Sequence, residues 1–558
     1  MQRENELMEW GKKHRYIVYL LIVYIGLISA VLFEQGVMCN DEALYQLYAR
    51  SGIKNFFRYF TYVQAYCKGR FLSAIPTTFF IYLGYANPAH WYVRGIAILV
   101  LFSSIVIFAK FLYEVFENIN LSIVFILLSW GYMPITFEPS APNAYVTLFG
   151  IPFILLIISL IMYVRGLKQN NKKNMIISSL LFFVPLCSYE IFITYTPLFL
   201  LLAYYYTKES DFYLRIRGTI NKFIYPFCSA IVFLILYIAT GRVFQTQYDG
   251  TKILFTIKGA LKIIKQLFAS SIPGYFLLNG KYQFLFKYYC ENKSDLFFKS
   301  LLKNLDIRVL VIAFIFMIVV INARKQKTKN KTHNGLVIVV GIIFALLPLT
   351  PLAISEMYQD NVTSTNFTEL PVCYFTNYAI CFCISYVICV IGLKKCPTWI
   401  KNLLLVFLVI LLISIQVMNT TIAKEQKKNY QRFSAIENVL NTYLFQNING
   451  SIIYSEDIFE TKNMLAINDA YWDVYMQNKG LSFNFTKEKD NAAWKFYFEN
   501  DEYFVLENGK EYFVLIPEDN HREWVYIETS EGILKKDAKN EAAVKNAGFR
   551  IYRYSIYE

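Results

Sequence analysis

Charged residues are scarce in this chain. Asp, Glu, Lys and Arg make up only 17% of its 558 residues, whereas 56% are hydrophobic. This balance, with a mean hydropathy of +0.36, is typical of a polytopic membrane protein and argues against a water-soluble enzyme. The sequence therefore predicts a large helical membrane domain and leaves room for one modest soluble domain.

Clusters of histidine and cysteine residues that could bind a metal ion are also lacking. The chain has 4 histidines and 10 cysteines, and neither type clusters in the spacing of a zinc site. Cys39 and Cys67 would share the first outer loop, either as a disulfide or as two thiols. A structural zinc site is thereby disfavoured, and the pairing of these two cysteines stays open.

The net charge of +14 does not indicate nucleic acid, because much of it falls in short loops between hydrophobic runs, where basic residues set membrane topology. Lys12, Lys13 and Arg15 precede an apolar run over residues 16–33. We interpret that run as a retained first span with a cytoplasmic N-terminus. The loop over residues 34–70 then lies outside.

The segment Phe71–Tyr85 is apolar but short and contains Pro76. We interpret it as a helix dipping into the outer leaflet, because counting it as a span would reverse the charge bias of the later loops. Basic loops then lie inside at residues 168–173, 208–222, 324–331 and 394–401. Eleven spans are expected, at about residues 16–33, 91–112, 121–135, 144–165, 175–188, 191–206, 224–243, 307–323, 335–355, 379–393 and 402–418.

The sequence predicts a membrane domain over residues 1–418 and a soluble, extracytoplasmic α+β domain over residues 419–558. Expected helices cover residues 431–445 and 538–547, and expected strands cover residues 451–454, 524–527 and 549–557. Residues 503–506 and 512–515 read as a hairpin turning at Asn508-Gly509.

Asp41 and Glu42 follow the first span directly. An acidic pair at a span end often serves only as a solvated helix cap. The functional interpretation is that one carboxylate removes a proton from an acceptor hydroxyl, while the other positions the acceptor or binds a divalent cation such as Mg²⁺ or Mn²⁺.

Lys68, Gly69 and Arg70 close the same outer loop. Basic residues near a membrane commonly anchor to lipid headgroups. The functional interpretation is that Lys68 and Arg70 bind a lipid phosphate. The planar guanidinium of Arg can donate two parallel hydrogen bonds to a phosphate, and glycine at position 69 would let the backbone approach the phosphate closely.

Further polar residues are expected at the same outer rim. A carboxylate close to hydrocarbon is costly unless it is paired or faces a wet cavity, so these positions are candidate site residues as well as candidate helix caps and anchors. Glu138 is a further catalytic candidate, Arg242 a further phosphate ligand, and the possible lining residues are Arg94, Tyr189 and Glu190.

Two outer segments are predicted to carry surface-lying helices, over residues 34–90 and 244–306. In the second, lysines alternate with apolar and aromatic residues, as in an amphipathic helix at a membrane surface. Such helices would cover the site, admit a lipid donor, or simply pack on the surface.

This pattern resembles the GT-C superfamily of membrane glycosyltransferases, most nearly the bacterial glucosyltransferase-like proteins of surface-polymer decoration. The resemblance covers roughly the first 250 residues. It rests on Asp41-Glu42 as the acidic motif, on Lys68-Gly69-Arg70 with Phe71–Tyr85 as the surface helix, and on Glu138 in the second outer loop. The motif here is Asp-Glu where many relatives have Asp-Asp, which leaves the base open between Asp41 and Glu42.

The resemblance implies transfer of a sugar, with inversion, from a polyprenyl-phosphate carrier to a surface glycan, a lipid-linked acceptor or a polymer. It places the protein in the bacterial cytoplasmic membrane with its chemistry on the outer face, where lipids are partners and nucleic acid is not. A polysaccharide polymerase or ligase would share this layout, with its key basic residues in the 244–306 loop. A flippase or transporter is less consistent, because the spans are nearly charge-free at their centres. A non-enzymatic surface-assembly protein is the remaining alternative.

Overall fold

The structure is a computed structural model. It describes residues 11, 14–36, 40–87, 89–136, 140–243, 252–254, 256–278, 302, 305–325, 334–359, 370–391, 397–448, 450–456, 458, 469–499, 503–509, 511–517, 527–529, 532–534, 542–546 and 549–555. The chain packs as two compact units, one of residues 1–35 and 48–424 and the other of residues 36–47 and 425–558.

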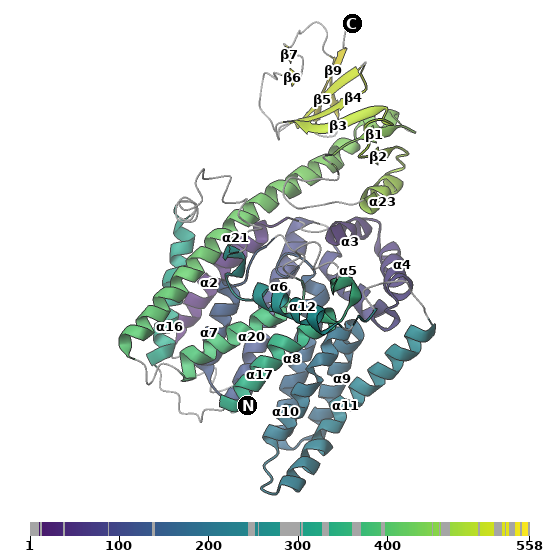
Figure 1. Ribbon diagram of the computed structural model, residues 1–558. Coiled ribbons are helices and arrows are strands. Elements are labelled where there is room, and N and C mark those ends of the chain that lie inside the picture. Colours follow the sequence, from purple (N-terminus) through teal and green to yellow (C-terminus); the bar gives the residue numbers. More distant parts are fainter. Residues whose placement is uncertain are drawn as a thin grey trace. The chain divides into compact units, whose positions relative to one another are not determined.

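The first unit is a bundle of apolar helices (Figure 1). Among the described residues, seven helical segments are long and apolar enough to cross a membrane, which indicates a multi-pass membrane protein. They lie in α2 (Arg15–Glu34), α6 (His90–Phe116), α8 (Val146–Gln169), α11 (Phe212–Val243), α16 (Ile307–Lys325), α17 (Asn334–Leu346, continued by η6, Leu347–Leu349, and α18, Thr350–Ala353) and α21 (Thr398–Leu440).

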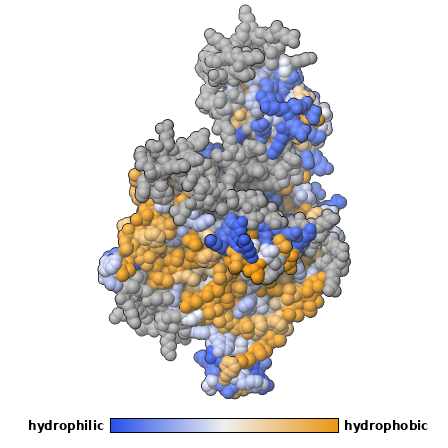
Figure 2. All heavy atoms as spheres, in the orientation of Figure 1, coloured by the Kyte–Doolittle hydropathy of each residue, from blue (hydrophilic) through white to orange (hydrophobic). Residues whose placement is uncertain are grey.

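The other four predicted spans coincide with shorter helices, so the count of eleven stays a prediction. These helices are α7 (Ile119–Gly131), α9 (Lys172–Ser188), η3 (Glu190–Tyr195) with α10 (Thr196–Tyr206), and α20 (Cys373–Tyr386) with η7 (Val387–Ile391). Figure 2 shows a broad hydrophobic surface on the helical unit that gives way to hydrophilic residues at the α10–α11 connection, residues 207–217.

Bonds between helices sort the loops of the bundle into two ends. One end, which we call the basic end, is held by Arg165 bonded to Glu114, Tyr163 to Lys222, Arg324 to Lys401 and Tyr16 to Asn322. The opposite end, which we call the Arg70 end, is held by Arg70 bonded to Glu190, Arg94 to Asn143, His90 to Phe33 and Arg308 to Thr420. The loops predicted inside fall in the first group and those predicted outside in the second, and the orientation of the two ends in the membrane stays a prediction.

Helix α5 (Ala74–Tyr85) keeps both of its ends at the Arg70 end. Near its start, Thr77 donates a hydrogen bond to the carbonyl of Ser188, where α9 ends. Near its finish, Gly84 lies so close to Thr147 in the first turn of α8 that a Cβ there would be 2.6 Å from the Thr147 hydroxyl oxygen. Helix α5 therefore does not run the length of the α8–α9 hairpin. This agrees with the interpretation of Phe71–Tyr85 as a surface segment and not a span.

The neighbouring helix α4 (Ile53–Tyr62) is amphipathic. Phe56 and Phe60 are buried, and Phe56 packs edge-on against Tyr82 of α5 at 5.4 Å, while Ile53 and Tyr62 are exposed. Within the 244–306 segment the structure describes α12 (Ile257–Ser270) and α13 (Tyr275–Leu278), whereas residues 279–301 lie outside the described part. Helix α12 is amphipathic, as predicted, with Ile263 and Leu267 buried and Leu261 exposed.

The second unit contains a seven-stranded sheet in the order β2-β1-β3-β4-β5-β9-β8, in which β1 runs parallel to β2 and β3 and the other pairs are antiparallel. The strands are β1 (Ile452–Tyr454), β2 (Asn484–Thr486), β3 (Trp494–Glu499), β4 (Tyr503–Glu507), β5 (Glu511–Pro517), β8 (Ala542–Asn546) and β9 (Phe549–Ser555). A separate pair is formed by β6 (Ile527–Thr529) and β7 (Gly532–Leu534), and the helices are the C-terminal part of α21, α22 (Tyr443–Asn447) and α23 (Asp469–Lys479). The predicted α+β class is confirmed.

The predicted hairpin is confirmed, because β4 and β5 pair across Asn508 and Gly509. Gly509 has a φ of +80°, a conformation that glycine adopts without strain. Val505 and Val514 lie opposite each other in the buried cluster of this hairpin.

The predicted helix over residues 538–547 is wrong for residues 542–546. This segment is strand β8, which pairs with β9 in the register Ala542↔Arg553 to Asn546↔Phe549. Its alanines favour helix locally, but the edge of β9 offers backbone hydrogen bonds that override this weak preference. Of the predicted strand 524–527, Ile527 begins β6 and the rest lies outside the described residues.

The domain boundary also differs from the prediction. Helix α21 runs unbroken through position 419, so the two units divide within a continuous helix, between Lys424 and Glu425. In addition, residues 36–47 pack with the C-terminal unit. A Cβ on Gly36 would lie only 2.1 Å from the Cβ of Tyr430 and 3.1 Å from the carbonyl of Gln426. The absence of a side chain at Gly36 therefore lets this segment lie against α21.

We expect Gly36→Val to destabilise the second unit by about 1–3 kcal/mol, because the neighbouring Cβ cannot move without shifting helix α21. Thermal unfolding and limited proteolysis of residues 36–47 would measure this. Gly26→Ala in α2 is the matched control, since nothing lies within 4 Å of a Cβ there. Equal behaviour of the two variants would contradict the close packing.

The two ends of the bundle are expected on opposite sides of the membrane, with the basic end inside. In a variant without the native cysteines, Lys54→Cys on α4 should react with a membrane-impermeant maleimide in intact cells. Lys208→Cys, at the α10–α11 connection, should react only after permeabilisation. The reverse labelling would overturn the orientation.

Candidate functional site

Arg70 sits in a tight turn whose backbone is held by local hydrogen bonds. The turn links the π-helix η1 (Val63–Cys67) to the 3-10 helix η2 (Phe71–Ser73). Gly69 adopts a φ of +64°, which explains a glycine at this position. The amide of Arg70 donates to the carbonyl of Gln64 at 2.8 Å, and the Ser73 hydroxyl donates to the carbonyl of Arg70 at 2.9 Å. The turn therefore fixes the position of the Arg70 backbone, from which the side chain extends.

The guanidinium of Arg70 contacts two consecutive residues, Tyr189 and Glu190, at the break between α9 and η3. Its Nη2 donates to Glu190 Oε1 at 2.8 Å and to the Tyr189 hydroxyl at 3.3 Å, and its Cζ lies 4.5 Å from the centre of the Tyr189 ring. Only 9% of the Arg70 side chain and 25% of the Glu190 side chain are exposed. The charge of Arg70 is thus desolvated, compensated and held in one orientation.

The helix break places both partners of Arg70. Helix α9 ends at Ser188, Tyr189 is extended with φ −157°, and η3 begins at Glu190. Three of the predicted outer-rim residues, Arg70, Tyr189 and Glu190, are therefore brought together by the fold.

Two neighbours of this cluster were missed from the sequence. The Tyr237 hydroxyl of α11 interacts electrostatically with Glu190 and Arg70, and the ring of Phe149 in α8 packs against Tyr189 at 4.9 Å. Both lie in apolar helix interiors among many similar aromatics, so no local pattern separates them from core residues.

Arg94 belongs to a second buried polar cluster at the same end. It is 2% exposed, and its Nη1 donates to the carbonyl of Asn143 at 3.3 Å. The Asn143 side chain accepts from Gln35 Nε2 at 2.9 Å and donates to the Thr136 hydroxyl at 3.0 Å. These bonds tie together the ends of α2 and α6 and the chain that leads into α8, which is the anchoring role foreseen as one alternative for Arg94.

Asp41 and Glu42 occupy the first turn of helix α3 (Asn40–Arg50), where carboxylates interact favourably with the helix dipole. Glu42 is buried, at 2% exposure, and Asp41 is half-buried. Both belong to the segment that packs with the C-terminal unit, whereas Arg70, Arg94 and Glu190 belong to the bundle.

The other predicted residues divide between described and undescribed positions. Lys68 caps η1, and its amide donates to the carbonyl of Val63 at 2.9 Å. Arg242 lies in the last turn of α11. Glu138 lies outside the described residues, and so does Cys39, whereas its potential partner Cys67 is a free thiol.

No protein-family model and no curated protein sequence matches this chain.

A metal site finds little support in the residues that the structure describes. Among them, no group of three or more His, Cys, Asp and Glu side chains could hold an ion. The pair Asp41 and Glu42 supplies two carboxylates of the kind that bind Mg²⁺ together with a substrate phosphate. Two carboxylates alone do not define a metal site.

Glu190→Gln would remove the charge that compensates Arg70. We expect a loss of about 1–3 kcal/mol in unfolding free energy, because a desolvated guanidinium is left without its counter-charge. The melting temperature of the purified protein in detergent would report it. Glu117→Gln is the control, since Glu117 pairs with Lys168 at 3.0 Å but is 49% exposed, and its loss should cost no more than about 0.5 kcal/mol. Equal effects would show that the Arg70 pair contributes no special stability.

Proposed function

We propose that the protein is a GT-C-type membrane glycosyltransferase. It transfers a sugar from a polyprenyl-phosphate donor to a glycan, lipid-linked or polymeric acceptor at the cell surface. The membrane is the bacterial cytoplasmic membrane, with the N-terminus in the cytoplasm and the Arg70 end and C-terminal unit outside.

The observation that carries the proposal is the buried and oriented Arg70. A phosphate that enters from a lipid leaflet needs a cation at the end of the bundle, in a site where water does not screen the charge. Arg70 meets this requirement, because only 9% of its side chain is exposed, and Glu190 and Tyr189 hold its guanidinium in one orientation. Surface helices α4 and α5 border the same turn, as a lipid-accepting site would require.

The proposed reaction is a single displacement. Asp41 accepts the proton of the acceptor hydroxyl as its oxygen bonds to the anomeric carbon. The bond from that carbon to the phosphate oxygen breaks on the opposite face, which inverts the configuration and releases polyprenyl phosphate. Arg70 stabilises the charge that grows on the leaving phosphate, and Glu42 positions the acceptor.

Asp41→Asn should lower transfer by about 10²–10⁴-fold, because the amide cannot accept the proton. The measurement is sugar transfer in reconstituted membranes from a panel of polyprenyl-phosphate sugars. Glu42→Gln is the matched comparison. The anomeric configuration of the product would show whether transfer proceeds with inversion.

Each outcome bears on the proposal. Equal turnover by wild type and Asp41→Asn would keep the enzyme class and reject Asp41 as the base. Consumption of no donor by folded protein would reject the proposal and favour a polymerase or ligase that uses lipid diphosphate, whose activity would depend on lysines of α12 such as Lys258 and Lys262.

A further inference from the structure

Helix α12 is attached to the bundle at its start. The side-chain amide of Gln359 donates to the carbonyls of Leu254 and Ala353, each at 2.8 Å. The Thr256 hydroxyl donates to Gln359 Oε1 at 2.6 Å, and the amide of Leu254 donates to the carbonyl of Ile354 at 2.9 Å. The chain that enters α12 is therefore held against the end of α18.

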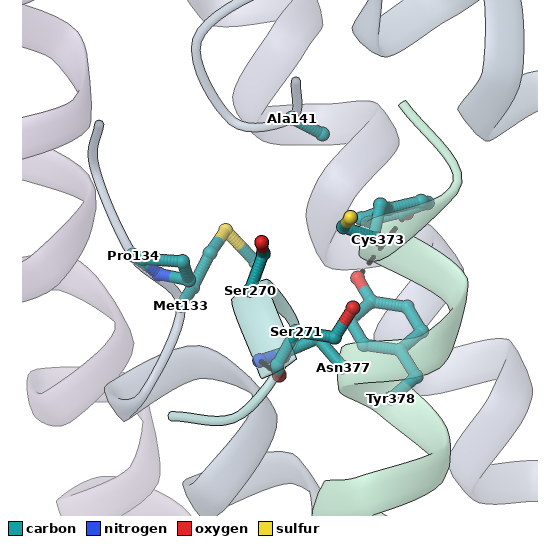
Figure 3. A pocket seen from close by; sticks show the side chains of 9 residues that line it. Met133, Pro134, Ala141, Ser270, Ser271, Cys373, Asn377 and Tyr378 are labelled. Atoms are coloured by element: carbon teal, nitrogen blue, oxygen red, sulfur yellow. Dashed lines mark hydrogen bonds between the residues drawn. The ribbon is translucent and has the colours of Figure 1, made fainter. Parts of the chain in front are cut away.

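The other end of α12 is attached as well. Asn377 of α20 donates to the carbonyl of Ser271 at 3.0 Å, and the Cys373 thiol donates to the carbonyl of Leu267 at 3.5 Å. Figure 3 shows this end of α12 between the segment after α7 and the start of α20. Attachment at both ends fixes the rotation of α12 about its axis, so the bundle sets which of its side chains face outward.

The side chains of α12 separate into stripes at helical spacing. Ile263 and Leu267, four positions apart, are buried against the bundle. Ile257 and Leu261, also four positions apart, are 67% and 61% exposed and form an outward-facing apolar stripe. An apolar stripe on the outside of a fixed helix favours contact with hydrocarbon over contact with water.

A stripe of exposed lysines runs beside the apolar stripe. Lys258, Lys262 and Lys265 are spaced by four and three positions, so all three lie on one side of the helix. Residues 257–270 include no Asp or Glu, and within the described part of the chain none of these lysines has an ion-pair partner. Like charges at this spacing repel one another, so a negatively charged partner would stabilise the stripe.

The surroundings of α12 match these two stripes. Figure 2 shows hydrophilic residues at α12 directly beside the broad hydrophobic surface of the bundle. A helix at such a border has an apolar side for the acyl chains and a charged side for the headgroups.

We propose that the exposed face of α12 is a docking surface for anionic phospholipids. The lysine stripe binds their phosphate-bearing headgroups, and the apolar stripe contacts their acyl chains. The protein thereby selects anionic lipid over zwitterionic lipid at this helix, whatever reaction it catalyses.

Other partners fit only one of the two stripes. A nucleic acid or an acidic protein would neutralise the lysines but would leave Ile257 and Leu261 in water. A zwitterionic lipid would cover the apolar stripe but would bring no net negative charge to the lysines. An anionic phospholipid satisfies both.

The test compares phosphatidylglycerol with phosphatidylcholine, both labelled with the same fluorophore on the acyl chain. Each is titrated against the full-length protein in micelles of an uncharged detergent, and binding is followed by fluorescence anisotropy. We expect the wild type to bind phosphatidylglycerol more tightly. Combined substitution of Lys258, Lys262 and Lys265 by Gln should weaken that binding by at least about fivefold and leave phosphatidylcholine binding unchanged.

Two further variants make the comparison specific. Combined substitution of Lys427, Lys479 and Lys489 by Gln is the matched control, because it removes the same charge from exposed lysines of the C-terminal unit. It should leave both affinities unchanged. Ile257→Ser combined with Leu261→Ser should weaken the binding of both lipids, because the apolar stripe does not distinguish headgroups. All these side chains are exposed, so the melting temperatures should stay near that of the wild type.

Four results would overturn the docking surface: equal affinity of the wild type for the two lipids, equal weakening by the two triple lysine variants, phosphatidylglycerol binding that survives loss of the apolar stripe, or tighter binding of farnesyl diphosphate that depends on the α12 lysines. The third result would indicate a soluble polyanion as the partner, and the fourth a lipid diphosphate substrate. Lipid binding is measured without a sugar donor, so its outcome and that of the transfer assay are independent.

Discussion

Backbone that leaves a helix inside an apolar bundle must find other hydrogen-bond partners, because lipid and hydrocarbon side chains supply none. This constraint governs the Arg70 end. The non-helical stretch after α7 is held by Gln416 and Asn419, and the end of α9 is held by Thr77. At the basic end the helices instead begin with ordinary local caps, from Asn118, Asn171 and Asp211. Within the described part of the chain, the stretch after α7 and the end of α9 are thus two places at the Arg70 end where distant side chains hold irregular backbone.

The same constraint explains why buried polar side chains gather there in pairs and networks. Arg70 is compensated by Glu190, and Arg94 is tied to Asn143, so neither charge is left in an apolar surrounding without a polar contact. Such groups hold the loops in one arrangement. They also create the oriented cation that the proposed reaction requires.

Helix α21 gives the chain an unusual division into units. It begins within the bundle and continues without interruption to Leu440, while residues 36–47 leave the bundle unit and pack with the C-terminal part of α21 at Gly36. The acidic pair Asp41-Glu42 is therefore part of the C-terminal unit.

Much of the architecture follows from the sequence by itself. Charge-free hydrophobic runs located the helices, and the distribution of lysine and arginine sorted the loops into two groups that match the two ends of the bundle, because both signals are local and act residue by residue. Asn508-Gly509 located a hairpin for the same reason.

Other features depend on partners distant in the sequence. The pairing of Arg70 with Glu190, 120 positions apart, required α9 to break beside a turn between surface helices. The strand at residues 542–546 required the edge of β9, and the hydrogen bond from Asn377 to the carbonyl of Ser271 required α20 to pack against the end of α12. Local propensity carries no information on contacts between residues that are far apart in the sequence, so only tertiary packing decides them.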